Sequence, residues 1–183
     1  HRYRKMAGRK IVDLNRYLRH TVFGLLGIFL MSPAVGLFAQ EDQLMDPEFE
    51  ALRSEARAYK NQDKPLQAQQ ALEQMAAWAE ANEDTKKAID TDLMFADLYL
   101  DRGLDNMAED HHTRSSSLLD NVEYPEGRAN NYYIKGRLIY QRGNSFMALQ
   151  EIQKAKGESN NRNFLNRVTL LEGRIKARLP NQE

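Results

Sequence analysis

The sequence predicts an all-α protein built as an α-solenoid, in which antiparallel helix hairpins stack on one another. Three stretches of the chain align without gaps at a spacing of forty residues. Within each stretch the apolar residues recur at intervals of three and four, which is the period of a helix. The chain has 183 residues, enough for one ordinary domain, and it has no cysteine, which excludes disulfides and thiol catalysis.

The repeat is most visible in its small residues. The aligned stretches are ARAYKNQDKPLQAQQAL from Ala56, ADLYLDRGLDNMAEDHH from Ala96 and GRLIYQRGNSFMALQEI from Gly136. Small side chains allow two helices to approach closely, so we expect these positions to lie where helices cross. The repeat-defining packing residues are Ala56, Ala68, Ala96, Ala108, Gly136, Ala148 and Ala155.

Each repeat is expected to consist of two helices joined by a short polar turn. Gly103 and Gly143 can supply the positive φ that ends a helix, while Pro65, Asp105 and Ser145 suit the start of the next one. The predicted repeat domain spans 47–179, with units at 47–82, 86–122 and 128–157 and a final helix at 162–179.

The N-terminal residues 1–39 read as an export signal. The uncharged stretch 21–40 follows a basic run, contains Pro33 and ends beside Ala39, the pattern of a signal peptide that is cleaved. The same stretch is about long enough for an uncleaved membrane anchor, and a buried core helix is the third reading. In the first two cases residues 41–183 lie outside the cytoplasm, in the bacterial periplasm or anchored facing it.

The order of small residues resembles the tetratricopeptide repeat. In that pattern a small residue is followed by an alanine twelve positions on and another small residue seven further, as at Gly136, Ala148 and Ala155. The second unit fits with Ser115 in the last place, whereas Met75 departs from the pattern in the first. The period of forty is longer than the family's usual value of about thirty-four. The resemblance covers 47–179 and implies a solenoid with a concave groove lined by the first helix of each pair.

This resemblance implies a non-catalytic scaffold that binds an extended or helical peptide segment of a partner protein. Residues 1–39 carry 7 Lys/Arg and 1 Asp, residues 40–124 carry 8 Lys/Arg and 20 Asp/Glu, and residues 125–183 carry 11 and 5. Because the chain after residue 39 is acidic overall, we expect no nucleic-acid partner. The opposite charges of the later blocks also suit head-to-tail self-association. The expected partner-binding residues are Arg53, Arg57, Asp97, Asp101, Arg137 and Gln141.

Two other classes of function stay open. An export signal followed by these repeats resembles the extracytoplasmic sensor region of bacterial membrane sensor kinases and related regulators, of which this chain would be a fragment. An enzyme is the more remote alternative, because the sequence contains no phosphate loop, dinucleotide turn or zinc-protease motif. Glu109, Asp110, His111 and His112 form the nearest approach to a metal site, and no second cluster completes it. We therefore expect no catalytic residue, cofactor or metal.

Overall fold

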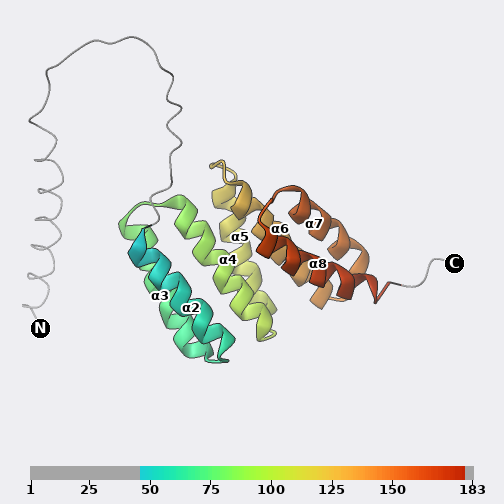
Figure 1. The fold of residues 1–183 in the computed structure, drawn as a ribbon, viewed down its shortest axis with the longest axis horizontal. Coiled ribbons are helices and arrows are strands. Elements are labelled where there is room, and N and C mark those ends of the chain that lie inside the picture. The colour runs from blue at the N-terminus through green and yellow to red at the C-terminus, as the bar shows by residue number, and fades with distance from the viewer. Residues whose placement is uncertain (1–45, 180–183) are drawn as a thin grey trace, which may run out of the picture. The chain divides into compact units, whose positions relative to one another are not determined.

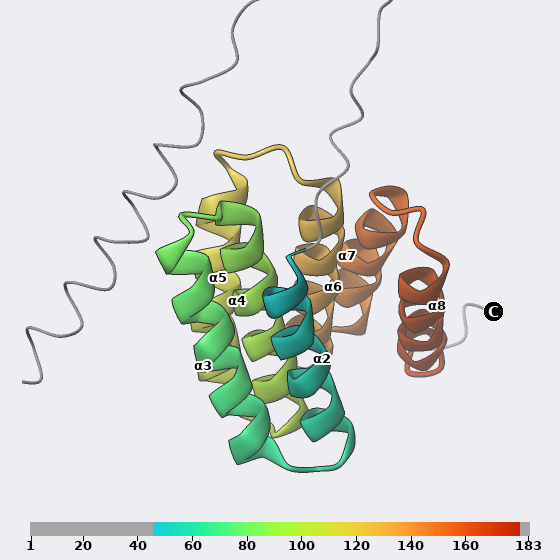
Figure 2. The same ribbon diagram turned by 60° about the vertical axis from the view of Figure 1, so that its left-hand side comes forward.

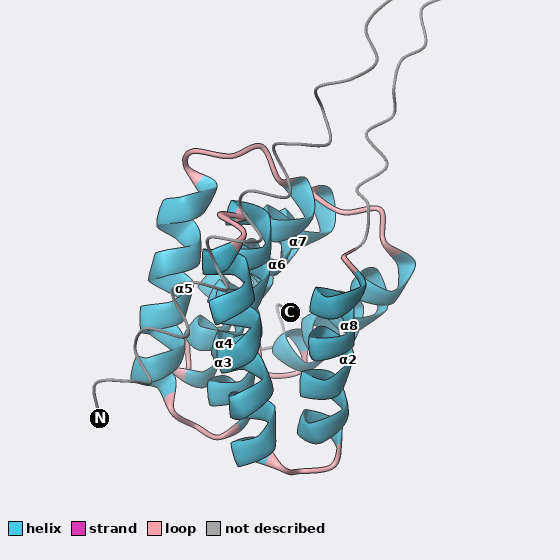
Figure 3. Ribbon diagram, turned by 90° about the vertical axis from the view of Figure 1, so that its left-hand side faces the viewer, coloured by secondary structure: helices cyan, strands magenta, loops and turns pink. Residues whose placement is uncertain are grey.

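The computed structural model describes residues 46–179, and within this range the chain forms seven α-helices and no strand (Figure 3). The all-α prediction is therefore confirmed for this part of the chain. The predicted export signal at 1–39, with its uncharged stretch 21–40, lies outside the described residues. The helices are α2 (Pro47–Asn61), α3 (Pro65–Ala81), α4 (Thr85–Asp101), α5 (Asp105–Leu119), α6 (Pro125–Gln141), α7 (Ser145–Gly157) and α8 (Arg162–Lys176).

The helices pack in pairs along the chain. Helix α2 packs on α3, α4 on α5 and α6 on α7, and Figure 1 shows these hairpins following one another in chain order up to α8. Contacts of α3 with α4, α5 with α6 and α7 with α8 join the hairpins, and α4 also packs against α6. The second helices begin at Pro65, Asp105 and Ser145, forty residues apart, as the repeat predicts.

Four of the six turns between helices share one backbone geometry, and Figure 2 shows the tight turn between α2 and α3. Gly103 and Gly143 have φ of 69° and 88°, which confirms their predicted role in ending α4 and α6. Asp63 and Glu83 adopt the same left-handed conformation, with φ of 55° and 53°, after α2 and α3. In each case the next residue donates its N–H to a carbonyl five positions back, as Leu104 does at 2.9 Å.

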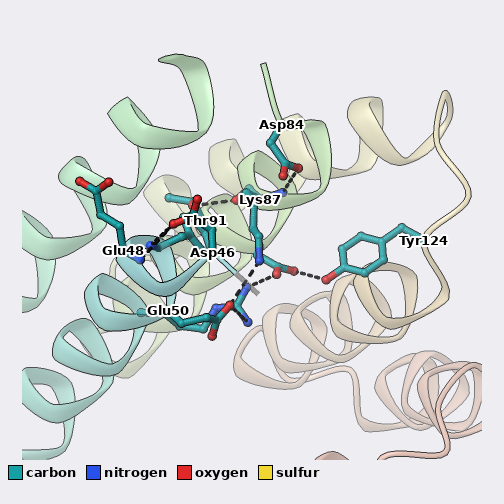
Figure 4. Close-up of polar contacts among 10 residues, drawn as sticks. Asp46, Glu48, Glu50, Asp84, Lys87, Thr91 and Tyr124 are labelled. Carbon is teal, nitrogen blue, oxygen red and sulfur yellow. Dashed lines mark hydrogen bonds and ion pairs between the residues drawn. The ribbon is translucent and has the colours of Figure 1, made fainter. Parts of the chain in front are cut away.

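Local signals set where the first helices begin. The Asp46 carboxylate accepts hydrogen bonds from the Glu48 and Phe49 N–H groups at 3.0 and 3.3 Å, and the Asp84 carboxylate accepts one from Lys87 at 3.0 Å (Figure 4). Helix α6 begins at Pro125, earlier than residue 128, where the repeat alignment places its start. Proline suits the first helical position because its φ is already helical and its missing N–H has no partner to lose there.

The small residues of the repeat lie in the core. The six alanines are at most 2% exposed, and Gly136 is buried as well. A Cβ on Gly136 would lie 2.7 Å from Ile152 Cδ1 and 3.4 Å from the Ala148 carbonyl oxygen. Helices α6 and α7 therefore cross at this glycine, and the side chain of Ile152 fills the space that a larger residue would need.

The described helices were also compared with the requirements of a membrane span. None of the helices between residues 46 and 179 combines the length and apolar character that crossing a bilayer requires.

Candidate ligand-binding groove

A groove of about 790 Å³ lies between α2, α4, α6 and α8. These are the first helices of the three hairpins together with the final helix. Of the second helices, α3 contributes Ala68 and Leu72, and no described residue of α5 or α7 lines the groove. The principal polar and apolar lining residues are Arg53, Arg57, Lys60, Asp90, Leu93, Asp97, Asp101, Asn130, Tyr133, Ile134, Arg137, Asn163, Phe164, Arg167, Leu171 and Arg174.

Five of the six expected partner-binding residues line this groove. They are Arg53, Arg57, Asp97, Asp101 and Arg137. The sixth, Gln141, does not line it. The Gln141 side-chain amide instead donates a hydrogen bond to the Leu100 carbonyl oxygen at 2.9 Å, which ties the end of α6 to α4.

The carboxylates of Asp97 and Asp101 are neutralised from both sides. Lys60 of α2 pairs with Asp97 and, at 2.9 Å, with Asp101. Arg137 of α6 also pairs with Asp97 and, at 2.6 Å, with Asp101. Two cations therefore meet two carboxylates, and this network links three successive first helices across the groove.

The same network favours the charged forms of Asp101 and Arg137. Burial alone would raise the pKa of Asp101, but hydrogen bonds from Lys60 and Arg137 outweigh it, so the pKa is lowered. Burial likewise works against the charge of Arg137, and its partners Asp97 and Asp101 outweigh burial and raise the Arg137 pKa. The two cations and two carboxylates of the network balance one another, so it leaves no free charge of its own.

A second network of ion pairs lies near the starts of α2 and α4. Asp90 of α4 pairs with Arg53 and accepts a hydrogen bond from the Tyr124 hydroxyl at 2.8 Å. Glu50 pairs with Arg53 at 3.2 Å and with Lys87 at 3.3 Å, and Figure 4 shows Lys87 and Tyr124 reaching this cluster from different elements. Burial raises the pKa of Asp90 in spite of the positive charge of Arg53. These contacts neutralise the charges near the start of α2.

Three groove arginines have no carboxylate partner within residues 46–179. They are Arg57 on α2 and Arg167 and Arg174 on α8. The Arg167 guanidinium lies 5.0 Å from the ring centroid of Tyr133 and 5.9 Å from that of Phe164. These aromatic contacts hold the guanidinium without cancelling its charge.

The acidic and histidine cluster on α5 is engaged in structure. His111 Nδ1 lies 2.8 Å from Asp92 Oδ1, and its ring stacks on Phe95 at a centroid distance of 4.5 Å. His112 is half-buried, and burial lowers the pKa of its imidazole. In the described part of the chain, no three histidine or carboxylate side chains converge in a way that could hold a metal ion.

The sequence alone did not assign Lys60, Tyr124 or the arginines of α8 to a binding surface. The sequence did contain a signal for the ion pairs between helices. Arg57, Asp97 and Arg137 occupy one repeat position forty residues apart, and their charges alternate in sign. That alternation indicates charge pairing across successive first helices. The sequence gives no such signal for α8, because its place along the groove depends on the path of the chain after α7.

Comparisons with known proteins give no match: no protein-family model matches the chain, and searches of curated proteins and of solved structures find no similar one. The structure by itself establishes a repeat-like bundle of consecutively packed helices.

Proposed function

We propose that the protein is a non-catalytic interaction scaffold of the tetratricopeptide type, which binds a peptide segment of a partner protein in the groove between α2, α4, α6 and α8. One observation carries the proposal. The groove is continuous along the first helices of all three hairpins and the final helix, so that each repeat contributes side chains to one shared surface.

The size and chemistry of the groove suit a peptide. A volume of about 790 Å³ lies within the range of about 300–1,000 Å³ that ligand sites occupy. Leu93, Ile134 and Leu171 offer apolar contact for side chains, and Asn130 and Asn163 offer amide groups that can bond a peptide backbone. The combination favours an extended segment that carries both apolar and polar side chains.

A tryptophan inside the groove tests this directly. Asn163 and Asn106 are both exposed and both occupy the second position of their helix, but only Asn163 lines the groove. We would select 12-residue peptides from a random library on the whole chain, and then measure binding to Asn163→Trp and Asn106→Trp. We expect Asn163→Trp to weaken the selected peptides at least about tenfold, and Asn106→Trp to leave them unchanged.

Selected peptides that bind both variants equally would contradict the proposal, since their site would lie outside the groove. Failure to select any peptide that is sensitive to Asn163→Trp would contradict it in the same way. Circular dichroism of both variants checks that each one retains its helices.

The proposed location is outside the cytoplasm, and it rests on the uncharged stretch 21–40 and the basic residues before it. A fusion of the chain to a reporter that is active only after export tests it. Reporter activity that is lost when charges are introduced into 21–40 is the expected result, and activity only in the cytoplasm would contradict it. The sensor-fragment alternative shares this location and the same groove.

A further inference from the structure

The groove carries an excess of positive charge that no described residue neutralises. Lys60 and Arg137 take both Asp97 and Asp101, while Arg53 takes Asp90. After this pairing, the cations that remain in the groove are Arg57, Arg167 and Arg174. Glu126, at the first turn of α6, is the one lining carboxylate for which the structure records no ion pair.

The repeat explains why Arg57 is left over. Arg57, Asp97 and Arg137 occupy the same position in successive units, so Asp97 lies between two arginines. Arg137 of α6 pairs with Asp97. From α2, the cation that pairs with Asp97 is Lys60, about one helical turn after Arg57, and not Arg57 itself. Arg57 is exposed to the groove without a partner from α4.

Arg57 of α2 and Arg167 of α8 both line the groove and carry the same charge. Arg167 lies over the rings of Tyr133 and Phe164 on the α8 side of the groove. Partial burial lowers the pKa of Arg57, and the positive charges of Arg53 and Arg167 also lower it. An anion between Arg57 and Arg167 would turn this repulsion into two attractive contacts.

We propose that Arg57 and Arg167 form an anion site that captures an aspartate or glutamate side chain of the partner peptide, and so joins the first and the last helix of the array. This inference rests on the proposed function and names the chemistry of its ligand. Arg174 lies on the same face of α8, seven residues after Arg167, a rise of about 10 Å. In an extended peptide with polyproline II geometry, three residues make one turn of about 9 Å, so side chains three positions apart lie on one face and a second acidic side chain at that spacing meets Arg174.

A peptide fits this site better than a nucleic acid. Only three groove arginines lack a carboxylate partner in the described part of the chain, and the other cations are paired with Asp90, Asp97 and Asp101, so a continuous polyanion would find few free charges along the groove. A peptide can place separate carboxylates at the arginines and apolar side chains near Leu93 and Leu171.

The experiment uses a fluorescein-labelled peptide of nine residues with glutamate at every third position, separated by leucine and alanine, and a matched peptide with glutamine in place of glutamate. Fluorescence anisotropy with the whole chain gives both affinities. We expect the glutamate peptide to bind at least about tenfold more tightly, and this advantage to shrink at high salt.

Three variants locate the effect. Arg57→Glu and Arg167→Gln are each expected to weaken the glutamate peptide about tenfold and to leave the glutamine peptide unchanged. Arg102→Glu is the matched control, because Arg102 is exposed and lies outside the groove. We expect it to change the affinity less than twofold. Circular dichroism confirms the fold of each variant, and Arg167→Gln keeps the test valid if the charge reversal at Arg57 disturbs α2.

Equal affinity for the two peptides, or an equal loss in Arg102→Glu, would overturn the anion site. Displacement of the glutamate peptide by a 12-nucleotide oligothymidine at similar concentration would overturn the assignment to a peptide. These outcomes can be distinguished from a failure of the proposed peptide-binding function. If library peptides still require an open groove, as judged with Asn163→Trp, while the arginine variants bind them normally, the groove function stands and the anion site falls.

Discussion

At the scale of single residues, the packing of α6 on α7 depends on the absence of a side chain at Gly136. The glycine could be predicted from the sequence because small residues recur at its repeat position in every unit. Its partner could not, because the register of α6 against α7 decides that Ile152 rather than a neighbour fills the space. Gly173 repeats the sequence around Gly136 on α8, yet a Cβ there would meet nothing within 4 Å.

These two glycines therefore respond in opposite ways to alanine. We expect Gly136→Ala to lower the free energy of unfolding by about 1–2 kcal/mol, because the clash with Ile152 outweighs the better helix propensity of alanine. Gly173→Ala should raise it by up to about 1 kcal/mol. Urea unfolding followed by circular dichroism measures both changes.

A second substitution checks the cause of the first. Ile152→Val removes the Cδ1 atom nearest to the added methyl group, so the double variant Gly136→Ala/Ile152→Val should be more stable than the two single effects predict when added. Strict additivity would show that the cost at Gly136 has another origin.

His112 gives the protein a pH-dependent component of stability. Burial, and then the charge of Lys135, lowers its pKa, while Glu109 and Glu151 oppose this shift. The unfolded chain therefore binds a proton more readily, and the stability present above about pH 6.5 is lost as the pH falls below it. The repeat places Leu72 and Ile152 at the same position, so His112→Leu is a natural test.

We expect the wild-type chain to lose more stability than His112→Leu between pH 7.5 and pH 5.5, by at most about 1 kcal/mol. Urea unfolding of both proteins at the two pH values measures the difference. Identical losses would show that His112 titrates alike in the folded and unfolded chain.

At the scale of elements, the helix starts were easier to predict than the helix ends. Pro65, Asp105 and Ser145 begin their helices as expected, because starting residues have strong and local preferences. Gly103 and Gly143 also signalled their turns. Asp63 and Glu83 adopt the same conformation without that signal, since the tertiary packing of α2, α3 and α4 imposes a backbone geometry that their side chains do not favour.

The four turns should consequently differ in their response to glycine and alanine. Asp63→Gly and Glu83→Gly are expected to raise the free energy of unfolding by about 0.5–1 kcal/mol each, because glycine adopts positive φ without steric cost. Gly103→Ala should lower it by about 1 kcal/mol for the same reason. Thermal unfolding can rank the variants.

A glycine substitution inside a helix serves as the control for these turn variants. Asp110 is exposed inside α5, where glycine is unfavourable, so Asp110→Gly should destabilise the protein by about 1 kcal/mol. Destabilisation by Asp63→Gly of the same size would mean that the left-handed turn contributes no strain.

At the scale of the whole molecule, the first helices of the hairpins line the groove together with α8, while α3 adds Ala68 and Leu72 and α5 and α7 add no described residue. A groove lined by the first helices is what the resemblance to the tetratricopeptide repeat implied. The sequence identified most of the charged residues of the groove, but it did not show which of them form ion pairs. Asp97, for example, pairs with cations from both neighbouring units. The contribution of α8, with Arg167 and Arg174, depends on tertiary structure alone.

The groove between α2, α4, α6 and α8 is the proposed binding surface. Hydrogen–deuterium exchange of the whole chain, with and without a peptide selected from the library, shows directly which helices the peptide covers. We expect slower exchange in α2, α4, α6 and α8 when the peptide is bound, and unchanged exchange in α5 and α7. Protection confined to α3, α5 and α7, with the groove helices unaffected, would contradict it.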